Sequence, residues 1–473
     1  MAFIKAETLA ELKAIAGEGA WLDSREDLSA YSIDFRRLYH GSTPLVLLPA
    51  DTEQVARILA VCNRDRVGVV PQGGNTGYCG GATPDETGSQ IVLSMRRLNR
   101  VRAVDAANNS MIVEAGCTLA ETHAAAAAEE RLFPLTLGSQ GTAQIGGNLS
   151  TNAGGTQVLR YGMMRDLVLG LEVVLPDGRV VSGLKSLRKD NTGYDLKSLF
   201  VGAEGTLGVI TAASLKLFPA PRDSATALAG VASPARALEL LAALRSAAGD
   251  ALTAFELMPR VAAELTVKHI AGVANPLGDG AAWYLLIELS SPNPRQQLAT
   301  LLTDALGEAS EHGTLENAVI ATSLSQAQAM WKLRESVPEA QRRHGASLKH
   351  DISVPVSRIP ELIERGSTVA RRLAPEGEVV SYGHMGDGNL HFNVSQRPGT
   401  DAQAFLARAE PLETALFDLV ESLDGSISAE HGIGRLKAHE FAQRADPVEL
   451  DAMRAIKRAL DPNGIMNPGK VLA

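Results

Sequence analysis

The chain has few cysteines, few aromatic residues and no excess of positive charge. Only three cysteines, Cys62, Cys79 and Cys117, occur in 473 residues. An odd, widely spaced set supplies neither a disulfide framework nor a zinc knuckle, so we expect a reducing compartment and predict a cytoplasmic protein. The formal net charge is −9. A nucleic-acid partner needs a basic surface, so we expect none.

Long apolar runs are also missing. No segment approaches the roughly 18 apolar residues that span a bilayer. The acidic residues Glu7, Glu11 and Glu18 near the N-terminus indicate an amphipathic helix rather than a signal peptide. Any membrane contact is therefore expected to be peripheral. With 45% hydrophobic residues, the chain can form the cores of two or three domains.

The sequence Gly383–Asn393 carries the clearest chemical signal. An Asp-Gly pair between apolar runs is typical of a two-residue type I′ hairpin turn, and we place Asp387 and Gly388 in such a turn. His384 then faces His391, with Cβ atoms roughly 4.5–5.5 Å apart. Two imidazoles at that separation can bind one divalent cation, so the hairpin predicts half of a metal site.

A third candidate ligand lies in the glycine-flanked segment 427–435, where Glu430 precedes His431. The set His384, His391 and Glu430 leaves coordination positions open, as a catalytic metal site requires. We expect Zn²⁺ at this site. Mn²⁺ and Co²⁺ are alternatives, because two histidines and a glutamate do not select among these three metals. An alternative stays open, in which the two histidines are packed or surface residues. Two histidines that face each other across a hairpin are packed or surface residues about as often as they are metal ligands.

Three tracts rich in glycine and small polar residues interrupt the first half of the chain. They are Pro71–Gly81, Gly138–Gly155 and Gly202–Thr211. Glycine lets backbone N–H groups approach an anion that a side chain would hold away. Pro71–Gly81 matches neither the dinucleotide fingerprint nor the P-loop, and alone it is more often an ordinary turn. Three such tracts together indicate a large nucleotide cofactor with an extended pyrophosphate.

Apolar periodicity and capping residues predict the surrounding elements. We expect helices at 5–16, 51–64, 119–130, 234–248 and 294–306, with another starting at 331, and no helix in 138–155. We expect strands at 45–48, 67–70, 90–94, 111–115, 167–175, 179–182, 282–289, 318–321, 349–355 and 379–382. A change of composition near Pro219 predicts domain limits of 1–221 and 222–425, followed by a C-terminal segment, 426–473.

Over residues 40–221 the three tracts resemble the flavin-contacting segments of the vanillyl-alcohol-oxidase-type FAD-binding domain. The resemblance implies FAD as cofactor. Members that bond flavin covalently through the first loop carry Gly-His there, whereas this chain has Asn75-Thr76-Gly77, so we expect non-covalent FAD. The implied cofactor-binding residues are Pro71, Gly73, Gly74, Asn75, Thr76, Gly77, Thr136, Gly138, Ser139, Gly146, Asn148, Thr151, Gly155, Glu204, Ile210 and Asn467.

Residues 222–473 resemble the cap of FAD-dependent D-2-hydroxyacid dehydrogenases. The matching stretches are Gly383–Asn393, Glu430–Arg435 and Asn467–Lys470. The resemblance implies an α+β fold, with a vanillyl-alcohol-oxidase-type FAD domain, an α+β cap domain and a C-terminal helical segment. It implies metal-assisted hydride transfer from a D-2-hydroxy acid to flavin N5, giving the 2-oxo acid.

Four further residues are candidates for catalysis. An imidazole titrates near neutral pH, so His431 is our candidate general base. Arg334 offers a planar fork for the substrate carboxylate. The resemblance implies that Lys349 and Asn393 line the substrate pocket. The alternative interpretation is that Arg334 and Lys349 are ordinary solvated charges on the protein surface.

The substrate is less closely defined by the sequence. We expect D-2-hydroxyglutarate, with D-lactate, glycolate or another monocarboxylate as the alternative. In the hydroxyglutarate type a Thr is expected four residues after the pocket Arg, but Pro338 stands there and offers neither hydroxyl nor N–H. Reduced flavin needs an electron acceptor, for which we expect an electron-transfer flavoprotein, a quinone or a cytochrome. A homodimer is compatible with the sequence. Competing classes are a non-catalytic subunit of a flavin oxidase and an oxidase that uses O₂ directly.

Overall fold

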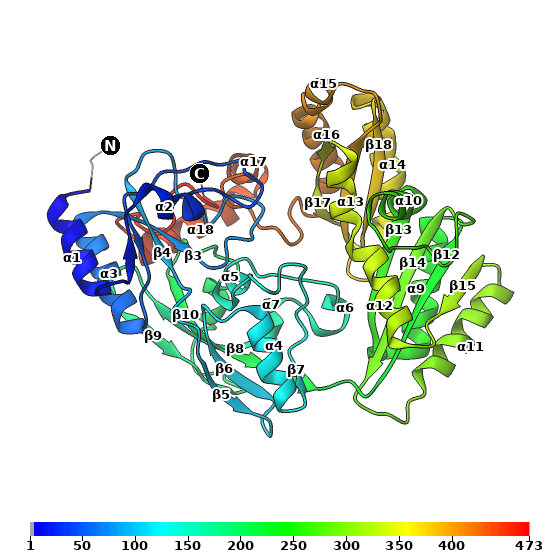
Figure 1. Cartoon of the computed structure of the whole chain (residues 1–473), viewed down its shortest axis with the longest axis horizontal. Coiled ribbons are helices and arrows are strands. Elements are labelled where there is room, and N and C mark those ends of the chain that lie inside the picture. The colour runs from blue at the N-terminus through cyan, green and yellow to red at the C-terminus, as the bar shows by residue number, and fades with distance from the viewer. Residues whose placement is uncertain (1–3, 473) are drawn as a thin grey trace. The chain divides into compact units, whose positions relative to one another are not determined.

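The computed structural model describes residues 4–472, and contacts within the chain divide it into two compact units (Figure 1). Unit 1 comprises Met1–Gly155, Gly162–Ala220 and Glu430–Ala473. Unit 2 comprises Thr156–Tyr161 and Pro221–Ala429. The chain therefore changes unit after Ala220 and returns after Ala429, one residue before Glu430.

Unit 1 contains short helices and two main sheets. Its first part holds α1 (Ala6–Ala16), β1 (Trp21–Leu22), α2 (Arg25–Ser32), β2 (Val46–Leu47), α3 (Thr52–Asp65), β3 (Gly68–Gln72) and β4 (Gln90–Ser94). Next come β5 (Val101–Asp105), β6 (Ser110–Glu114), α4 (Leu119–Ala128), β7 (Arg131–Leu132), α5 (Ile145–Ser150), α7 (Met164–Leu167), β8 (Val168–Val174), β9 (Val180–Gly183), α8 (Lys197–Phe200), β10 (Val209–Lys216) and β11 (Phe218–Pro219). The C-terminal segment adds α17 (Ala438–Arg444) and α18 (Pro447–Leu460).

The first sheet of unit 1 has the order β1-β2-β4-β3. Helix α3 begins where the Asp51 side chain accepts the Gln54 N–H, and its apolar side is buried. Strands β2 and β3 both run parallel to β4. The C-terminal segment joins this sheet, because Val69 pairs in parallel with Met466. The end of the chain therefore lies directly beside the strand that leads into the first glycine tract.

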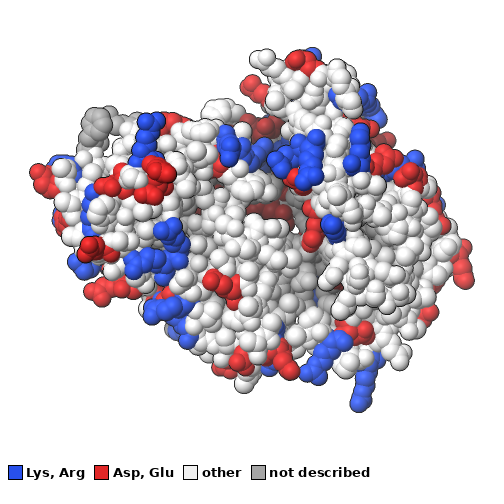
Figure 2. Space-filling model, in the orientation of Figure 1, with Lys and Arg blue, Asp and Glu red and all other residues white. Residues whose placement is uncertain are grey.

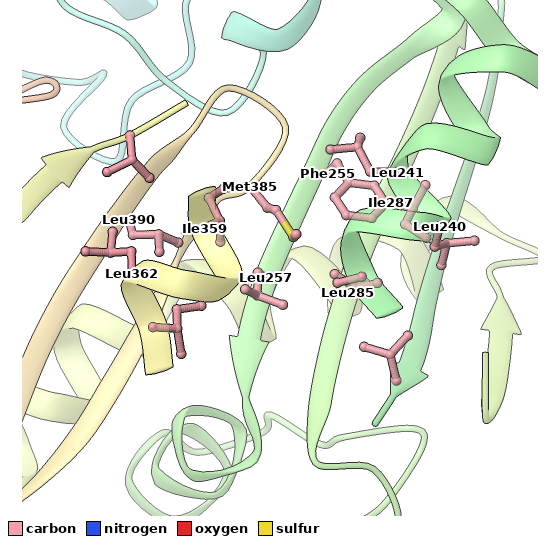
Figure 3. Packing of buried hydrophobic residues seen from close by; sticks show 14 of the residues in the cluster. Leu240, Leu241, Phe255, Leu257, Leu285, Ile287, Ile359, Leu362, Met385 and Leu390 are labelled. Atoms are coloured by element: carbon pink, nitrogen blue, oxygen red, sulfur yellow. The ribbon is translucent and has the colours of Figure 1, made fainter. Parts of the chain in front are cut away.

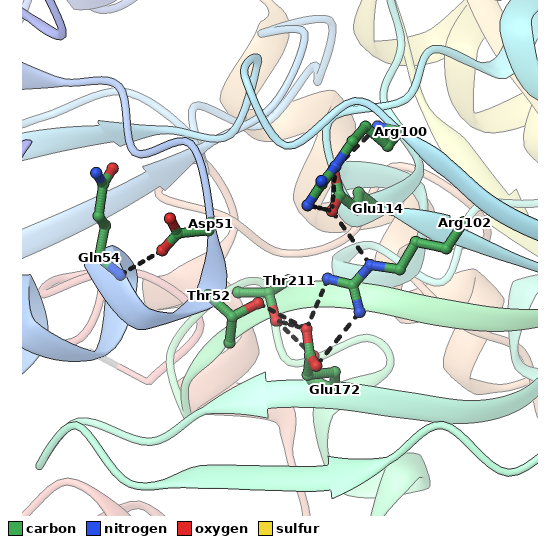
Figure 4. A network of polar contacts seen from close by, with 8 residues as sticks. All are labelled: Asp51, Thr52, Gln54, Arg100, Arg102, Glu114, Glu172 and Thr211. Carbon is green, nitrogen blue, oxygen red and sulfur yellow. Dashed lines mark hydrogen bonds and ion pairs between the residues drawn. The ribbon is translucent and has the colours of Figure 1, made fainter.

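The second sheet of unit 1 is antiparallel, with the order β5-β6-β10-β8-β9. A polar network links its strands (Figure 4). The fully buried Glu114 carboxylate pairs with Arg100 and Arg102, and Arg102 also pairs with Glu172. Thr211 donates to Glu172 as well. Each buried carboxylate of the network thus has cationic or hydroxyl partners, which burial of a charge requires.

Unit 2 contains one large antiparallel sheet with helices on both faces. Its elements are α6 (Val158–Tyr161), β12 (Asp223–Val231), α9 (Pro234–Ala248), β13 (Leu252–Pro259), α10 (Arg260–His269), β14 (Trp283–Ser291), α11 (Leu298–Glu311), β15 (Asn317–Ile320), α12 (Leu324–Glu335), α13 (Val337–His344), β16 (Ser347–Leu348), β17 (Asp351–Ser353), α14 (Ile359–Leu373), β18 (Gly377–His384), β19 (Asn389–Gln396), α15 (Ala402–Leu406) and α16 (Ala409–Glu421). The strand order is β15-β12-β14-β13-β18-β19-β16, and β17 pairs with β19.

The two faces of this sheet bury different clusters. On one face, Phe255 and Leu257 of β13 pack with side chains of α9 and α14 such as Leu240 and Leu362 (Figure 3). On the other face, Met258 packs with residues of α10, α12 and α13. Because side chains alternate along a strand, Glu256 points to the second face, away from the cluster of Figure 3.

Most predicted elements are present with ends shifted by a few residues, but three of the helix and strand predictions are wrong. A short helix, α5, lies inside the tract 138–155, where we expected none. Trp331 lies near the end of α12 rather than at the start of a helix, because Ser323 caps that helix at its N-terminus. The expected strand 349–355 is divided into β16 and β17, with Lys349 in the break.

The hairpin forms with a longer loop than we predicted. The loop comprises Met385–Gly388, and Tyr382 rather than His384 pairs with His391. Of the two predicted turn residues, Gly388 has a positive φ and Asp387 does not. The reason is tertiary: His384 pairs with Glu256 of β13 instead of with β19. The pairing register differs from the predicted one by two residues, and side chains two residues apart on a strand point to the same face. Both histidines therefore still lie on the same side of the sheet.

The visible surface carries charges of both signs. Figure 2 shows Lys and Arg interspersed with Asp and Glu. Several form pairs along helices, such as Arg358 and Arg365 with Glu361 in unit 2. None of the helices within residues 4–472 combines the length and the apolar character that crossing a bilayer needs.

Candidate functional site

A cavity that opens to solvent lies among the glycine tracts of unit 1. Most of the predicted cofactor residues line it. These are Pro71, Gly73, Gly74, Asn75, Thr76, Gly77, Gly146, Asn148, Thr151, Glu204 and Ile210. His431, our candidate base, lines the same cavity. The structure therefore brings the first and second tracts, the third tract and the segment after Glu430 to one place in unit 1.

Five predicted cofactor residues do not line this cavity: Thr136, Gly138, Ser139, Gly155 and Asn467. Asn467 instead donates from Nδ2 to the carbonyl oxygens of Gly81 and Glu204, at 2.8 and 2.7 Å. Gly155 packs on the backbone of Thr136, where an added Cβ would lie 2.1 Å from the carbonyl oxygen. These contacts hold the tracts together. A direct contact of these five residues with the cofactor stays a prediction.

The cavity fits a polar cofactor. The buried Oε1 of Gln144 and Nδ2 of Asn148, both in the lining, have no hydrogen-bond partner among the described residues. A buried amide group without a partner is costly, so these atoms are ready to bind a polar group. Cβ atoms built on Gly77 and Gly147 would meet nothing within 4 Å, so a cofactor can approach the backbone there. This arrangement fits the polar edges of FAD.

Glu204 fixes the segment that carries His431. Its two carboxylate oxygens accept the backbone N–H groups of Ile433 and Gly434, at 2.7 and 2.9 Å. Burial raises the pKa of Glu204, and the two N–H groups act in the opposite direction. Gly432 has a φ of 75°, and an added Cβ would lie 2.7 Å from Glu204 Oε1, so glycine is required there. Glu204 was predicted to contact the cofactor, but its visible partners are backbone groups of this loop.

The first glycine tract contacts the same loop. The rings of Tyr78 and His431 lie with centroids 4.6 Å apart. The carbonyl of Cys79 accepts N–H groups of Arg435 and Leu436. Arg435 forms an ion pair with Glu86. The loop that follows Glu430 is thus fixed to the first tract by ring contact and backbone hydrogen bonds, and to Glu86, beyond the tract, by charge.

In unit 2 a buried carboxylate joins two of the predicted site residues. Glu256 Oε2 accepts a hydrogen bond from Nε of Arg334 at 2.8 Å and forms an ion pair with Nη2 at 2.7 Å. Glu256 Oε1 lies 2.7 Å from Nδ1 of His384. Burial raises the pKa of Glu256, but the adjacent His384 and Arg334 outweigh burial and hold it well below its usual range. The carboxylate is therefore ionised and accepts hydrogen bonds from both partners.

His384 and His391 lie close together as predicted, although not as directly paired residues. Their ring centroids are 5.6 Å apart, and ring nitrogens of the two lie within 4.8 Å of each other. Asp351 of β17 pairs with His391 in the sheet, and its Oδ1 lies 3.8 Å from His391 Nδ1. Asn389 donates to the same Asp351 oxygen. Each histidine thus has a buried carboxylate near Nδ1, an arrangement common around metal ligands.

The other predicted pocket residues differ in their surroundings. Asn393 is buried, donates from Nδ2 to Gln341 and accepts the His350 N–H at Oδ1. Lys349 is exposed in the break between β16 and β17. Pro338 is exposed in the first turn of α13. Arg334 alone of the predicted polar pocket residues combines deep burial with a carboxylate partner and an aromatic ring, Tyr382, 4.9 Å away.

Sequence reasoning missed Glu256, although a signal was present. It is the only charged residue in the apolar segment Leu252–Pro259. A lone carboxylate in a strand that is buried on both faces needs a partner or a function. Gln144 was also missed, because a single amide in a glycine tract has no pattern that marks it.

The chain matches two protein families. It matches the family described as FAD linked oxidases, C-terminal domain, over residues 220–471. It matches the family described as FAD binding domain over residues 43–183. The second match covers the first two glycine tracts, and the first covers the hairpin and the segment around Glu430.

Named relatives are similar over almost the whole chain. A probable mitochondrial D-2-hydroxyglutarate dehydrogenase of Oryza sativa subsp. japonica is 38% identical, over 99% of this chain and 82% of the relative. A putative mitochondrial D-lactate dehydrogenase of Schizosaccharomyces pombe is 37% identical, over 97% of this chain and 88% of the relative. Among solved structures, p-cresol methylhydroxylase shares the fold, with a TM-score of 0.76, 16% identity and coverage of 98% and 96%.

These names correct one expectation. The prediction of a cytoplasmic location is wrong, because both relatives are named as mitochondrial proteins. The number of cysteines indicates a reducing environment and does not distinguish among the compartments that provide one.

Proposed function

The chain belongs to the FAD-linked oxidases and, within them, to the FAD-dependent D-2-hydroxyacid dehydrogenases; we propose that its substrate is D-2-hydroxyglutarate, which it oxidises to 2-oxoglutarate. The observation that carries the proposal is the buried Arg334 guanidinium, held by Glu256 on the same carboxylate as His384. A cation anchored beside a candidate metal ligand suits a substrate with adjacent carboxylate and hydroxyl groups.

Arg334 would bind the substrate carboxylate. Its Nε and Nη2 form the edge that faces Glu256. The end-on edge, made by Nη1 and the second N–H of Nη2, has no partner among residues 4–472. This edge has the geometry for a bidentate carboxylate, and Tyr382 supports the guanidinium plane.

His384 and His391 would hold a divalent cation, with Glu430 as the third ligand predicted from the sequence. We propose Zn²⁺, with Mn²⁺ and Co²⁺ as alternatives. A cation there supplies Lewis acidity toward the 2-hydroxyl group. The two histidines support this proposal by their distance and by the buried carboxylates near Nδ1 of each ring.

His431 would take the proton of the 2-hydroxyl group. It lines the flavin cavity of unit 1, and its ring rests on Tyr78. Non-covalent FAD, when bound, supplies the acceptor for the hydride that leaves the substrate carbon. The amide groups of Gln144 and Asn148 would bind FAD, and Glu204 would keep the His431 loop in place. Lys349 and Asn393 remain proposed pocket residues.

D-lactate is the second candidate substrate, since a relative bears that name. The exposed Pro338 favours it, because proline offers no donor for the distal carboxylate of a diacid. The exposed Lys349 favours the diacid, because it can supply such a cation. For reoxidation of the flavin we propose an electron-transfer flavoprotein, a quinone or a cytochrome as the electron acceptor. We also propose that the protein forms a homodimer.

The test is reduction of the bound flavin without oxygen. Purified holoenzyme would be mixed with D-2-hydroxyglutarate, L-2-hydroxyglutarate, D-malate or D-lactate, and the visible flavin band followed. We expect the fastest bleaching with D-2-hydroxyglutarate and none with its L-enantiomer. Bleaching by D-lactate alone would replace the diacid with the monocarboxylate, and no bleaching by any D-2-hydroxy acid would overturn the proposal.

A further inference from the structure

The two carboxylate oxygens of Glu256 contact two different residues, for which we propose different roles. Oε2 faces Arg334 and Oε1 faces His384. Glu256 is 1% exposed and Arg334 is 5% exposed, so water does not compete for these hydrogen bonds. The three residues come from β13, α12 and β18, and all belong to unit 2. One rigid carboxylate thus orients both a guanidinium and an imidazole.

A purely structural role is the first alternative to consider. A buried ion pair contributes little net stability compared with apolar residues of the same size, because both charges lose their hydration. Stability alone therefore does not explain the residue. The neighbouring strand β14 carries another carboxylate, Glu288, which is half-buried and accepts hydrogen bonds from Trp331 Nε1 and Thr253. Glu288 lies on the same face of the sheet but contacts neither Arg334 nor His384 in the described structure.

The geometry of each hydrogen bond determines which part of the partner faces away. Because Glu256 takes the Nε edge of Arg334, the end-on edge of the guanidinium points elsewhere. Because Glu256 accepts from Nδ1 of His384, the lone pair of that ring belongs to Nε2, the nitrogen that then serves as a metal ligand. A shift of the carboxylate changes both orientations together.

We propose that Glu256 is a positioning residue that couples cation binding at His384 to carboxylate binding at Arg334. The proposal rests on the proposed function for the role of Arg334, and on the His384–His391 pair for the cation. It assigns to Glu256 the coupling of two ligands, so that each ligand binds more tightly when the other is present.

Glu256→Gln is a sharp test because an amide cannot replace both interactions. If its oxygen accepts from Arg334, its NH₂ faces Nδ1 of His384, and that ring must place its proton on Nε2, which then cannot bind a cation. If its oxygen faces His384, two donors oppose each other at Arg334. One of the two orientations is lost in either case.

The experiment compares purified wild-type, Glu256→Gln and Glu288→Gln holoenzymes. Zn²⁺ affinity is measured calorimetrically after chelation, with and without 2-oxoglutarate, and 2-oxoglutarate affinity is measured from the flavin absorbance change, with and without Zn²⁺. For Glu256→Gln we expect a loss of about 10–100-fold in Zn²⁺ affinity. We also expect the mutual enhancement between Zn²⁺ and 2-oxoglutarate to disappear. Glu288→Gln, the matched control, should keep both affinities and the enhancement.

Arg334→Lys provides a second test that leaves Glu256 in place. The introduced ammonium group would offer Glu256 a point charge instead of a fork, so the carboxylate would be less fixed and Zn²⁺ affinity should fall, although Arg334 is not a proposed metal ligand. This measurement decides the matter if Glu256→Gln fails to fold. Unchanged Zn²⁺ affinity in Arg334→Lys, or equal losses in Glu256→Gln and Glu288→Gln, would overturn the proposal.

The two proposals fail in different ways. If no D-2-hydroxy acid reduces the wild-type flavin while Glu256→Gln still loses Zn²⁺ selectively, the proposed function is wrong and the orientation of His384 by Glu256 stands. If D-2-hydroxyglutarate reduces the wild-type flavin while Glu256→Gln keeps its Zn²⁺ affinity, the coupling is wrong and the proposed function stands.

Discussion

Tyr78 and His431 lie with ring centroids 4.6 Å apart and interplanar angle 51°, joining the first glycine tract to the segment near the C-terminus. Phe35 also contacts the Tyr78 ring edge-on, with ring centroids 5.6 Å apart. The candidate base is therefore supported by an aromatic side chain from the cofactor loop. Sequence reasoning did not select Tyr78 as a site residue.

The first prediction concerns this ring contact. We expect Tyr78→Ala to keep bound FAD but to lower kcat for D-2-hydroxyglutarate by about tenfold, because a less fixed base is less often in position. Tyr78→Phe keeps the ring and should restore most of the activity. Flavin content is read from the absorbance spectrum, and kcat from steady-state turnover with an artificial acceptor. An unchanged kcat in Tyr78→Ala would show that the contact does not position His431.

The second prediction concerns Glu204. Glu204→Gln replaces one of the two oxygens that accept the Ile433 and Gly434 N–H groups with an NH₂ group, which cannot accept. We expect a loss of about 1–3 kcal/mol in the free energy of unfolding, measured in urea. Glu86→Gln, which removes the carboxylate of the more exposed pair with Arg435, is the control and should cost less than about 1 kcal/mol. Equal losses would contradict the special role of Glu204.

The third prediction concerns the histidine pair. His384→Ala and His391→Ala should each keep FAD, lose the bound divalent cation and abolish turnover, because two ligands of the proposed site lie on these rings. Metal content is measured by elemental analysis after dialysis. His269→Ala, which removes a histidine that contacts His344 elsewhere in unit 2, is the control and should change neither metal content nor turnover. Full activity of wild-type enzyme after chelation would exclude a catalytic cation.

The fourth prediction concerns acid stability. Burial raises the pKa of Glu114, but hydrogen bonds and charge from Arg100 and Arg102 outweigh it and lower the pKa overall. A carboxylate with a lowered folded-state pKa stabilises the fold above its unfolded pKa of about 4.3 and loses this contribution as pH falls through the folded value. We expect Glu114→Gln to be less stable than wild type at pH 7, by about 1–3 kcal/mol.

The difference between Glu114→Gln and wild type should shrink below about pH 4. Urea unfolding at neutral and acidic pH measures it. Glu361→Gln removes an exposed carboxylate that is paired with Arg358 and Arg365, and it should leave the unfolding midpoint unchanged at both pH values. A difference for Glu114→Gln that persists undiminished in acid would mean that packing, and not charge, stabilises this position.

Local signals in the sequence predicted many elements closely. Helix α9 has the predicted ends, Pro234–Ala248, because Ser233 caps it and Gly249 follows it. Strand β4 coincides with the predicted 90–94. Most residues predicted to bind the cofactor also line one cavity of unit 1, since glycine tracts indicate where a backbone must stay uncovered, and their contact with FAD stays a prediction. Each of these features depends on residues that are near one another in the chain.

The sequence by itself determined the α+β class, the glycine tracts of the cofactor cavity and the placement of two histidines on one hairpin. Only the tertiary structure decided the register of that hairpin, because His384 pairs with Glu256 of a distant strand and not across the turn. The shared carboxylate of Glu256 and the Tyr78–His431 contact were decided in the same way. A turn or a cap is set by neighbours in the chain, whereas a buried charge is satisfied by whichever partners folding brings to it.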